Sequence, residues 1–250
     1  MRAVWRGSSA LCLSLVCFCA LRADDQAESK PLLEKAIKAM GGEEKLAKLK
    51  SGSWKAKITG QEDGKEIVLA SEGLWQGRDQ YKMDVELQIN GMIKKAVVVI
   101  NGENGWATEN DKTRDAPKEI LTFIKNVIYS MRVPQMLPSL SDQEFTLSPL
   151  GEVKVGDVEA VGLRIAHKDF KEVSLFFNKK DGLPIKTEIA LTDPGSKEIT
   201  IECLFSDYKD FDGIKHPAKL TIKADGKEFT MEINEVKVLD KQDDSVFAKP

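Results

Sequence analysis

The side chains that could carry chemistry in this chain do not form a recognisable constellation. His167 at the end of a predicted strand and His216 before Pro217 in a predicted turn lack the cysteine or carboxylate spacing of metal ligands. Ser139 lacks the Gly-x-Ser-x-Gly pattern of a nucleophile elbow, and no Ser/His/Asp set can be argued. The segment Asn110-Asp111-Lys112 lacks the other positions of a calcium loop and is typical of a solvated turn. We therefore expect no catalytic residue, metal or cofactor, and a hydrolytic enzyme is the least favoured function.

The first residues predict export. Arg2 and Arg6 precede an apolar run over residues 10–21, which is the pattern of a secretory signal peptide cleaved near Ala23. A membrane-spanning helix needs roughly 20 apolar residues, and no later segment approaches that length. We predict a periplasmic or secreted protein without a transmembrane segment, in which residues 24–250 form a single domain.

Removal of residues 1–23 takes away three of the four cysteines, so Cys203 has no intramolecular partner and no disulfide framework is expected. Cys203 alternates in step with Ile201 and Phe205, which predicts a buried thiol that alkylates slowly. Three of the 37 basic residues also lie in the removed segment, so 34 remain against 40 acidic residues. This mildly acidic chain gives no reason to expect a nucleic acid or an anionic membrane surface as partner. We expect a monomer.

Alternating hydrophobicity dominates the rest of the chain. Apolar residues at two-residue spacing stop at an Asn90-Gly91 turn, as in an amphipathic strand that enters a hairpin: Tyr81, Met83, Val85, Leu87 and Ile89. Similar signals predict strands at 52–60, 65–76, 80–89, 92–100, 105–109, 144–148, 157–167, 172–178, 184–192, 198–208, 217–224 and 228–239. In the last of these the apolar parity changes, which predicts a bulge near Asn234-Glu235.

Two helical regions interrupt these strands. Residues 29–50 predict two short helices separated by Gly41-Gly42. Asp115 is positioned to cap a third helix that ends before Pro134. Its apolar surface is wide enough to need burial on more than one side: Ile120, Leu121, Phe123, Ile124, Val127, Ile128 and Met131. These elements predict a mainly β fold with a few helices, in which a single strongly curved antiparallel sheet, an incomplete β-barrel, has helices packed against its concave side.

Four segments carry a resemblance to a known family. They are AIKAMGGEEKLAKLKSGSWKAKITG, DGLPIKTEI, YKDFDGIKHPAKLTI and the terminal INEVKVLDKQDDSVFAKP. In this order and spacing the chain resembles the LolA/LolB-like superfamily of outer-membrane lipoprotein-sorting proteins over residues 30–250. The resemblance implies an unclosed barrel, covered by helices, that holds acyl chains or another apolar ligand. It identifies no residue of this chain as the carrier's functional arginine or the receptor's apolar loop.

The predicted function is therefore that of a binding protein without chemistry, which carries a lipid, a lipoprotein acyl chain or another hydrophobic ligand. Envelope lipoproteins or a membrane-associated protein are its possible partners. The alternative is a sensor or adaptor of the cell envelope that binds a protein partner, near residues 132–141. The tryptophans among the candidate residues could equally be core aromatics. The candidate cavity lining is Trp54, Ala56, Ile58, Trp75, Tyr81, Met83, Val85, Leu87, Trp106, Ile120, Phe123, Ile124 and Val127.

Overall fold

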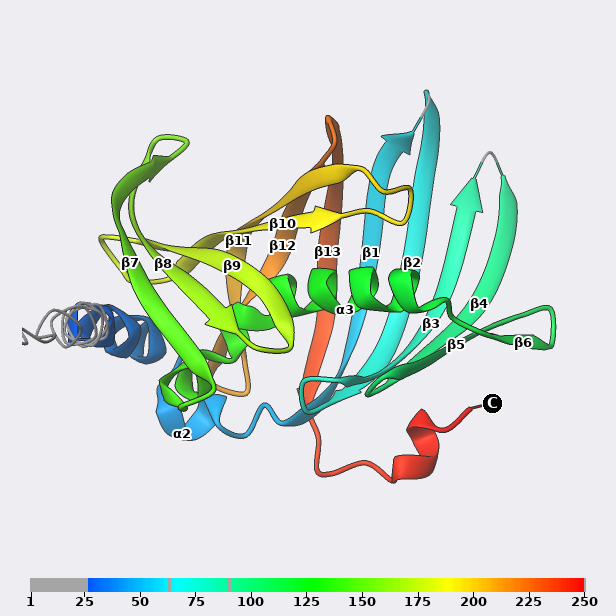
Figure 1. The fold of residues 1–250 in the computed structure, drawn as a ribbon, viewed down its shortest axis with the longest axis horizontal. Coiled ribbons are helices and arrows are strands. Elements are labelled where there is room, and N and C mark those ends of the chain that lie inside the picture. Colours follow the sequence, from blue (N-terminus) through cyan, green and yellow to red (C-terminus); the bar gives the residue numbers. More distant parts are fainter. Residues whose placement is uncertain (1–26, 63, 90, 250) are drawn as a thin grey trace, which may run out of the picture.

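One antiparallel sheet of thirteen strands makes up most of the protein in the computed structural model (Figure 1). The structure describes residues 27–62, 64–89 and 91–249, so the expected signal peptide and two turn residues, Asp63 and Asn90, lie outside the described residues. The strands are β1 (Ser51–Glu62), β2 (Lys65–Gln76), β3 (Gln80–Ile89), β4 (Met92–Asn101), β5 (Asn104–Glu109), β6 (Lys112–Asp115), β7 (Phe145–Val155), β8 (Val158–His167), β9 (Phe170–Asn178), β10 (Pro184–Thr192), β11 (Glu198–Phe211), β12 (Ile214–Ala224) and β13 (Lys227–Val238).

The strand order runs β6-β5-β4-β3-β2-β1-β13-β12-β11-β10-β9-β8-β7. Strands β1 to β6 form one meander and β7 to β13 form a second, and the two join where β1 pairs with β13. The sheet curves strongly without closing, and β6 and β7 remain its edges (Figure 1). Helix α3 (Lys118–Arg132) crosses its concave side. The predicted fold class, a curved antiparallel sheet with helices against its concave side, is confirmed.

The remaining helices are short. Residues 27–39 form a helix, and α2 (Glu43–Leu46) follows after Gly41 and Gly42, whose positive φ angles separate the two helices as predicted. Three 3₁₀ helices are η1 (Val133–Gln135), η2 (Leu137–Ser141) and η3 (Asp244–Phe247). No helix among the described residues is long and apolar enough to cross a membrane.

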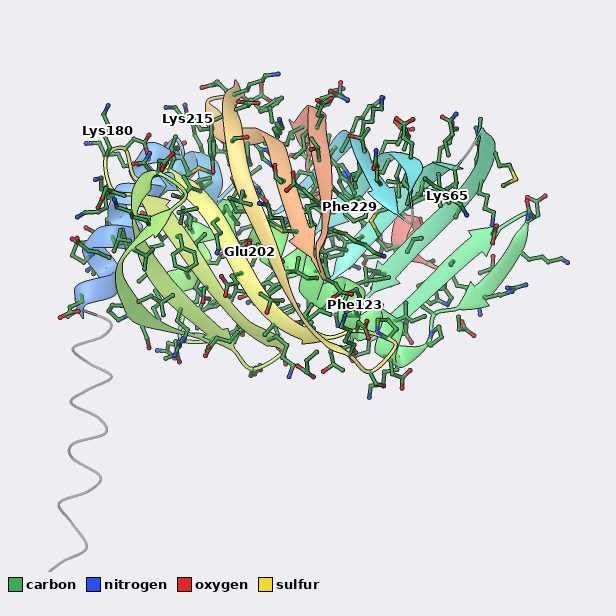
Figure 2. All side chains as sticks on the ribbon, turned by 90° about the horizontal axis from the view of Figure 1, so that it is seen from above. Lys65, Phe123, Lys180, Glu202, Lys215 and Phe229 are labelled. Carbon is green, nitrogen blue, oxygen red and sulfur yellow. The ribbon has the colours of Figure 1, made fainter. Side chains whose placement is uncertain are left out.

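Side-chain alternation separates a buried concave face from a charged convex face. Leu163 on β8, Leu175 on β9 and Ile189 on β10 are among the most deeply buried strand residues. The convex face carries cross-strand ion pairs such as Lys55–Glu72, with Nζ and Oε2 3.1 Å apart. Figure 2 shows Glu202 on the sheet and Lys65, Lys180 and Lys215 towards the ends of strands, where they reach solvent. The alternation of apolar and charged residues in the sequence therefore correctly predicts which side chains lie on the concave face and which lie on the convex face.

The predicted bulge in the last strand is confirmed. Lys55 pairs with Glu235 and Ala56 pairs with Ile233, so Asn234 is the extra residue on β13. This bulge keeps Ile233 and Val236 on the concave side, where both are buried.

Three predictions of local structure are wrong. Asp115 does not cap α3, because it ends an additional short strand, β6, and Pro117 occupies the N-cap position without a side-chain hydrogen bond. Strand β7 continues to Val155, because a register shift between Pro149 and Gly151 leaves Leu150 as one extra residue and the pairing with β8 resumes after it. His216 lies within β12 and not in a turn, since that strand begins at Ile214.

Candidate ligand-binding cavity

A predominantly apolar cavity of about 320 Å³ lies between the C-terminal half of α3 and the strands on both sides of the β1–β13 pair. Its volume is at the lower end of the range of small-molecule sites, roughly 300 to 1,000 Å³. The lining consists of Leu49, Trp54, Ile58, Leu69, Ser71, Trp75, Tyr81, Met83, Val85, Val127, Ile128, Met131, Arg132, Gln135, His216, Leu220, Met231, Ile233 and Val236.

Two tryptophan–glycine pairs form the floor of the cavity. Trp54 on β1 is in register with Gly73 on β2, and Trp75 on β2 is in register with Gly52 on β1. A Cβ at Gly73 would come within 2.7 Å of the Trp54 ring, and one at Gly52 would come within 2.2 Å of the Trp75 ring. Each indole therefore lies over the glycine of the neighbouring strand. The space above the rings stays open because the rings lie close to the sheet.

The two indoles also contact each other, with ring centroids 6.1 Å apart and planes inclined by 37°. The Trp75 Nε1–H donates a hydrogen bond to the carbonyl oxygen of Leu49 at 3.4 Å. This bond holds one edge of the floor against the segment that follows α2. A buried indole needs such a partner, so its position is determined by polar as well as apolar contacts.

Helix α3 forms the opposite wall, and its two sides differ in burial. Asn126, Tyr129 and Ser130 are buried on the side that packs against β9, β10 and β11. The Asn126 Oδ1 accepts a hydrogen bond from the Lys171 backbone N–H at 2.7 Å, which fixes the helix to β9. Val127, like Ile128 and Met131, is only half-buried and lines the cavity. The wide apolar surface of α3 is thus divided between a packed side and a side that faces open space.

The polar corner of the cavity lies where α3 ends. Arg132 Nη1 donates to the carbonyl oxygen of Gly77 at 3.0 Å and to the Tyr81 hydroxyl at 2.8 Å. Its guanidinium carbon lies 5.0 Å from the Trp75 ring centroid and 5.4 Å from that of Tyr81, within the range of cation–π attraction. The Arg132 guanidinium is therefore held at the edge of the apolar cavity by two neutral acceptor oxygens and two aromatic rings.

His216 completes this corner from β12. Its Nδ1 lies 2.8 Å from the carbonyl oxygen of Pro217, which can only accept, so Nδ1 carries the proton and Nε2 is left as an acceptor. Burial lowers the pKa of His216 to about 4, and the positive charge of Arg132 also lowers it. The imidazole is consequently neutral near pH 7.

The structure brings together part of the predicted lining. Seven of the candidate residues line the cavity: Trp54, Ile58, Trp75, Tyr81, Met83, Val85 and Val127. The other six do not line it: Ala56, Leu87, Trp106, Ile120, Phe123 and Ile124. Ala56 is buried on the concave side, but its methyl group is short beside its neighbours Trp54 and Ile58. Ile120 is 38% exposed in the first turn of α3.

Trp106 lies on the other face of the sheet. Its neighbour Gly105 faces α3, since a Cβ there would come within 2.8 Å of Leu121 Cδ1, and alternation turns Trp106 to the convex side. Trp106 is the cross-strand partner of Asp115 on β6, and the Asp115 carboxylate pairs with Lys249 at 2.7 Å. The Trp106–Asp115 pair therefore joins the edge of the sheet to the C-terminal segment.

Sequence reasoning missed the contribution of β12 and β13, and it missed Arg132. Met231 and Ile233 pair with Ile58 and Ala56 across the β1–β13 junction, so they face the same space. The apolar alternation of the last strand was visible in the sequence, but nothing local indicates that this strand pairs with the first one. The contact of Arg132 with the Trp75 floor likewise depends on how α3 crosses the sheet.

The other reactive side chains occupy structural positions. The His167 side chain is almost completely buried, its Nδ1 accepts from the Asp169 backbone N–H at 3.1 Å, and Nε2 lies 3.5 Å from Glu144 Oε2. Cys203 is fully buried, and burial raises the pKa of its thiol to about 12. Asn110 and Asp111 form a tight turn with positive φ angles. Within the described part of the chain, no group of three or more His, Cys, Asp or Glu residues could hold a metal ion.

Comparison with known proteins relates the fold to solved structures. No family model and no curated protein matches the sequence. A LolA superfamily protein from Nitrosomonas europaea superposes with a TM-score of 0.56 at 13% identity, covering 88% of this chain and 97% of that one. A DUF1329 family protein from Desulfovibrio piger gives 0.55 at 13% identity, covering 88% and 96%. A domain described as an outer membrane lipoprotein-sorting protein, from Vibrio parahaemolyticus, gives 0.55 at 11%, covering 87% and 96%. The resemblance found in the sequence is thus confirmed as a shared fold.

Proposed function

We propose that this chain is an exported carrier that binds a lipid, a lipoprotein acyl chain or another hydrophobic ligand in the cavity beneath α3, without acting on it chemically. The observation that supports this function best is the cavity itself, in which half-buried apolar side chains of α3 face a floor of two indoles. A fold shared with LolA superfamily and lipoprotein-sorting structures points in the same direction. We propose that the seven predicted residues in the lining contact the ligand.

The energetics of an empty cavity support an occupant. At roughly 24 cal/mol per Å³, a closed and dry cavity of 320 Å³ would cost about 8 kcal/mol, and this space costs less than that because it is partly open to solvent. Water fills such a space poorly, because a buried water needs about three hydrogen-bonding partners and most of this lining offers none. An acyl chain has no hydrogen bonds to lose and can fill this space. A methylene occupies roughly 30 Å³, similar to a water molecule in the liquid, so about ten methylenes fit.

The adaptor alternative has less support. Its expected docking surface, residues 132–141, folds into two 3₁₀ helices in which Val133, Leu137 and Leu140 are at most 1% exposed. A segment whose apolar side chains already belong to the core offers few of them to a partner. We retain a monomeric, single-domain exported protein as the proposal, with envelope lipoproteins or a membrane-associated protein as its candidate partners.

Solvent extraction of the purified mature protein, followed by mass spectrometry, tests the carrier function. We expect an apolar molecule to co-purify in stoichiometric amount, and the delipidated protein to bind fluorescent fatty acids saturably. Absence of both a co-purifying molecule and binding across several acyl ligands would contradict the proposal.

A further inference from the structure

Arg132 is the only permanently charged side chain among the cavity-lining residues, and no carboxylate of the described residues pairs with it. Two other arginines in the described part of the chain do have carboxylate partners: Arg78 pairs with Glu144, and Arg164 pairs with Glu172. Arg132 is only half-exposed, and its contacts are the neutral Gly77 and Tyr81 oxygens and two aromatic rings. Its positive charge is therefore not balanced by the protein.

The free part of the guanidinium matches an anion. A guanidinium has five N–H donors in a planar fork, and both hydrogen bonds of Arg132 involve Nη1. Nη2 and Nε have no acceptor among the described residues, and this edge can form the two parallel bonds that carboxylate and phosphate oxygens accept. Such charge-assisted bonds are stronger where water is scarce, as at an apolar rim.

Neither neighbouring side chain carries a negative charge that would oppose an anion. Gln135 has an amide NH2 that can donate to an anion, whereas the unprotonated Nε2 of His216 can only accept and forms no bond with a carboxylate. Since the predicted mature chain carries more acidic than basic residues, its overall field does not attract anions. Any preference for an anionic ligand must therefore come from a local contact.

From this geometry we propose that the ligand is an amphiphile with an anionic head, a long-chain carboxylate or a phosphate monoester, whose head pairs with Arg132 while its chain lies over the Trp54 and Trp75 rings. This inference rests on the proposed carrier function and specifies the class of ligand. A neutral lipid would fill the apolar floor equally well, but it would leave the Arg132 charge unbalanced.

Binding of three probes of equal chain length tests the head-group contact. Dodecanoate, methyl dodecanoate and dodecyl phosphate are titrated below their critical micelle concentrations into the delipidated mature protein at pH 7.5. We expect the wild-type protein to bind one or both anions about tenfold to a hundredfold more tightly than the neutral ester. The tighter anion identifies the head as carboxylate or phosphate, and either result supports the proposal.

Two substitutions separate recognition from support of α3. Arg132→Met should reduce anion affinity to that of the ester and leave ester affinity within about threefold, whereas Arg132→Lys should retain part of the preference. Arg114→Met, which removes an exposed arginine of β6, is the matched control and should change neither affinity. Melting temperatures of all variants report whether each one folds.

Three results would overturn the inference, and they are distinguishable. Equal affinity of the wild-type protein for anions and ester would exclude the head-group contact and leave the carrier function standing. Loss of ester and anion binding together in both Arg132 variants would show that Arg132 only braces α3. Binding of none of the probes by the wild-type protein would remove the carrier function itself, and the ligand class with it.

Discussion

Replacement of Val85 by tryptophan should distinguish an open binding cavity from a filled core. Val85 lies in the middle of β3, half-buried, with its side chain in the cavity lining. An indole in place of the isopropyl group adds the volume of about three methylenes, roughly a third of the ten that the cavity holds. At about 0.8 kcal/mol per buried methylene, acyl binding should weaken by about 2.4 kcal/mol, or about fiftyfold.

The stability of Val85→Trp is the second measurement. Because the added ring enters existing space, we expect the urea midpoint to change little, whereas overpacking of a filled core typically costs about 1 to 3 kcal/mol. Leu87→Trp is the matched control, since Leu87 lies two residues further along the same face but outside the lining. It should leave fluorescent fatty-acid affinity within about twofold.

Wild-type affinity in Val85→Trp would refute this account of the cavity. A strongly destabilised Val85→Trp, together with no measurable binding by the delipidated wild-type protein, would identify the region as a packed core. In that case the adaptor function becomes the better hypothesis.

Four further outcomes follow from the same structure. Cys203 should resist alkylation near pH 7.5 until denaturant is added, because burial raises its pKa to about 12; stoichiometric labelling of the native protein would contradict its placement. The pKa of His216 is about 4 in the folded protein and about 6.5 in the unfolded chain, so only the unfolded chain binds a proton between these pH values. The free energy of unfolding should therefore fall by up to about 3 kcal/mol as the pH is lowered from 6.5 to 4. Denaturant titrations across this range should show a weaker pH dependence of that free energy in His216→Asn than in the wild type. Tyr129→Phe should keep or raise the unfolding free energy by about 1 kcal/mol, because the buried Tyr129 hydroxyl has no partner among the described residues; a clear loss would reveal a bond to water. Trp106→Ala should lower the melting temperature and leave acyl affinity unchanged, since Trp106 lies on the convex face; weaker binding would place it in the site.

The fold could be predicted from the sequence because its strongest signal is local. The alternation from Tyr81 to Ile89 has a period of two, and a one-residue error would place every charged side chain in the core. The parity change near Asn234 located a bulge for the same reason. The errors occurred where local signals compete: Pro149 and Gly151 resemble a turn, and the bulge in β7 accommodates them.

The site was less predictable, because a cavity is defined by elements that are distant in sequence. Parity correctly placed Tyr81, Met83 and Val85 on the concave face, and the space they line exists only because α3 and β13 face them. Trp106 was misassigned because hydrophobicity suggested an inward-facing aromatic, whereas Gly105 occupies the inward position and makes room for Leu121. A residue with no side chain gives no hydrophobic signal, so its inward orientation could not be recognised.

Simple dimensions explain why the concave face is left partly uncovered. Thirteen strands spaced by about 4.8 Å give a sheet about 58 Å wide, whereas α3, with 15 residues at about 1.5 Å each, is about 22 Å long. Even lying across the strands, it spans fewer than half of them, and its buried side packs against β9, β10 and β11 (Figure 1). The side chains of β1 to β3 therefore face the less-packed side of the helix across open space. Additional bulk on α3 should reduce this space, so Val127→Trp should weaken acyl binding as Val85→Trp does, from the opposite wall. If Val127→Trp bound acyl ligands as tightly as the wild type, the ligand would not lie between α3 and the sheet.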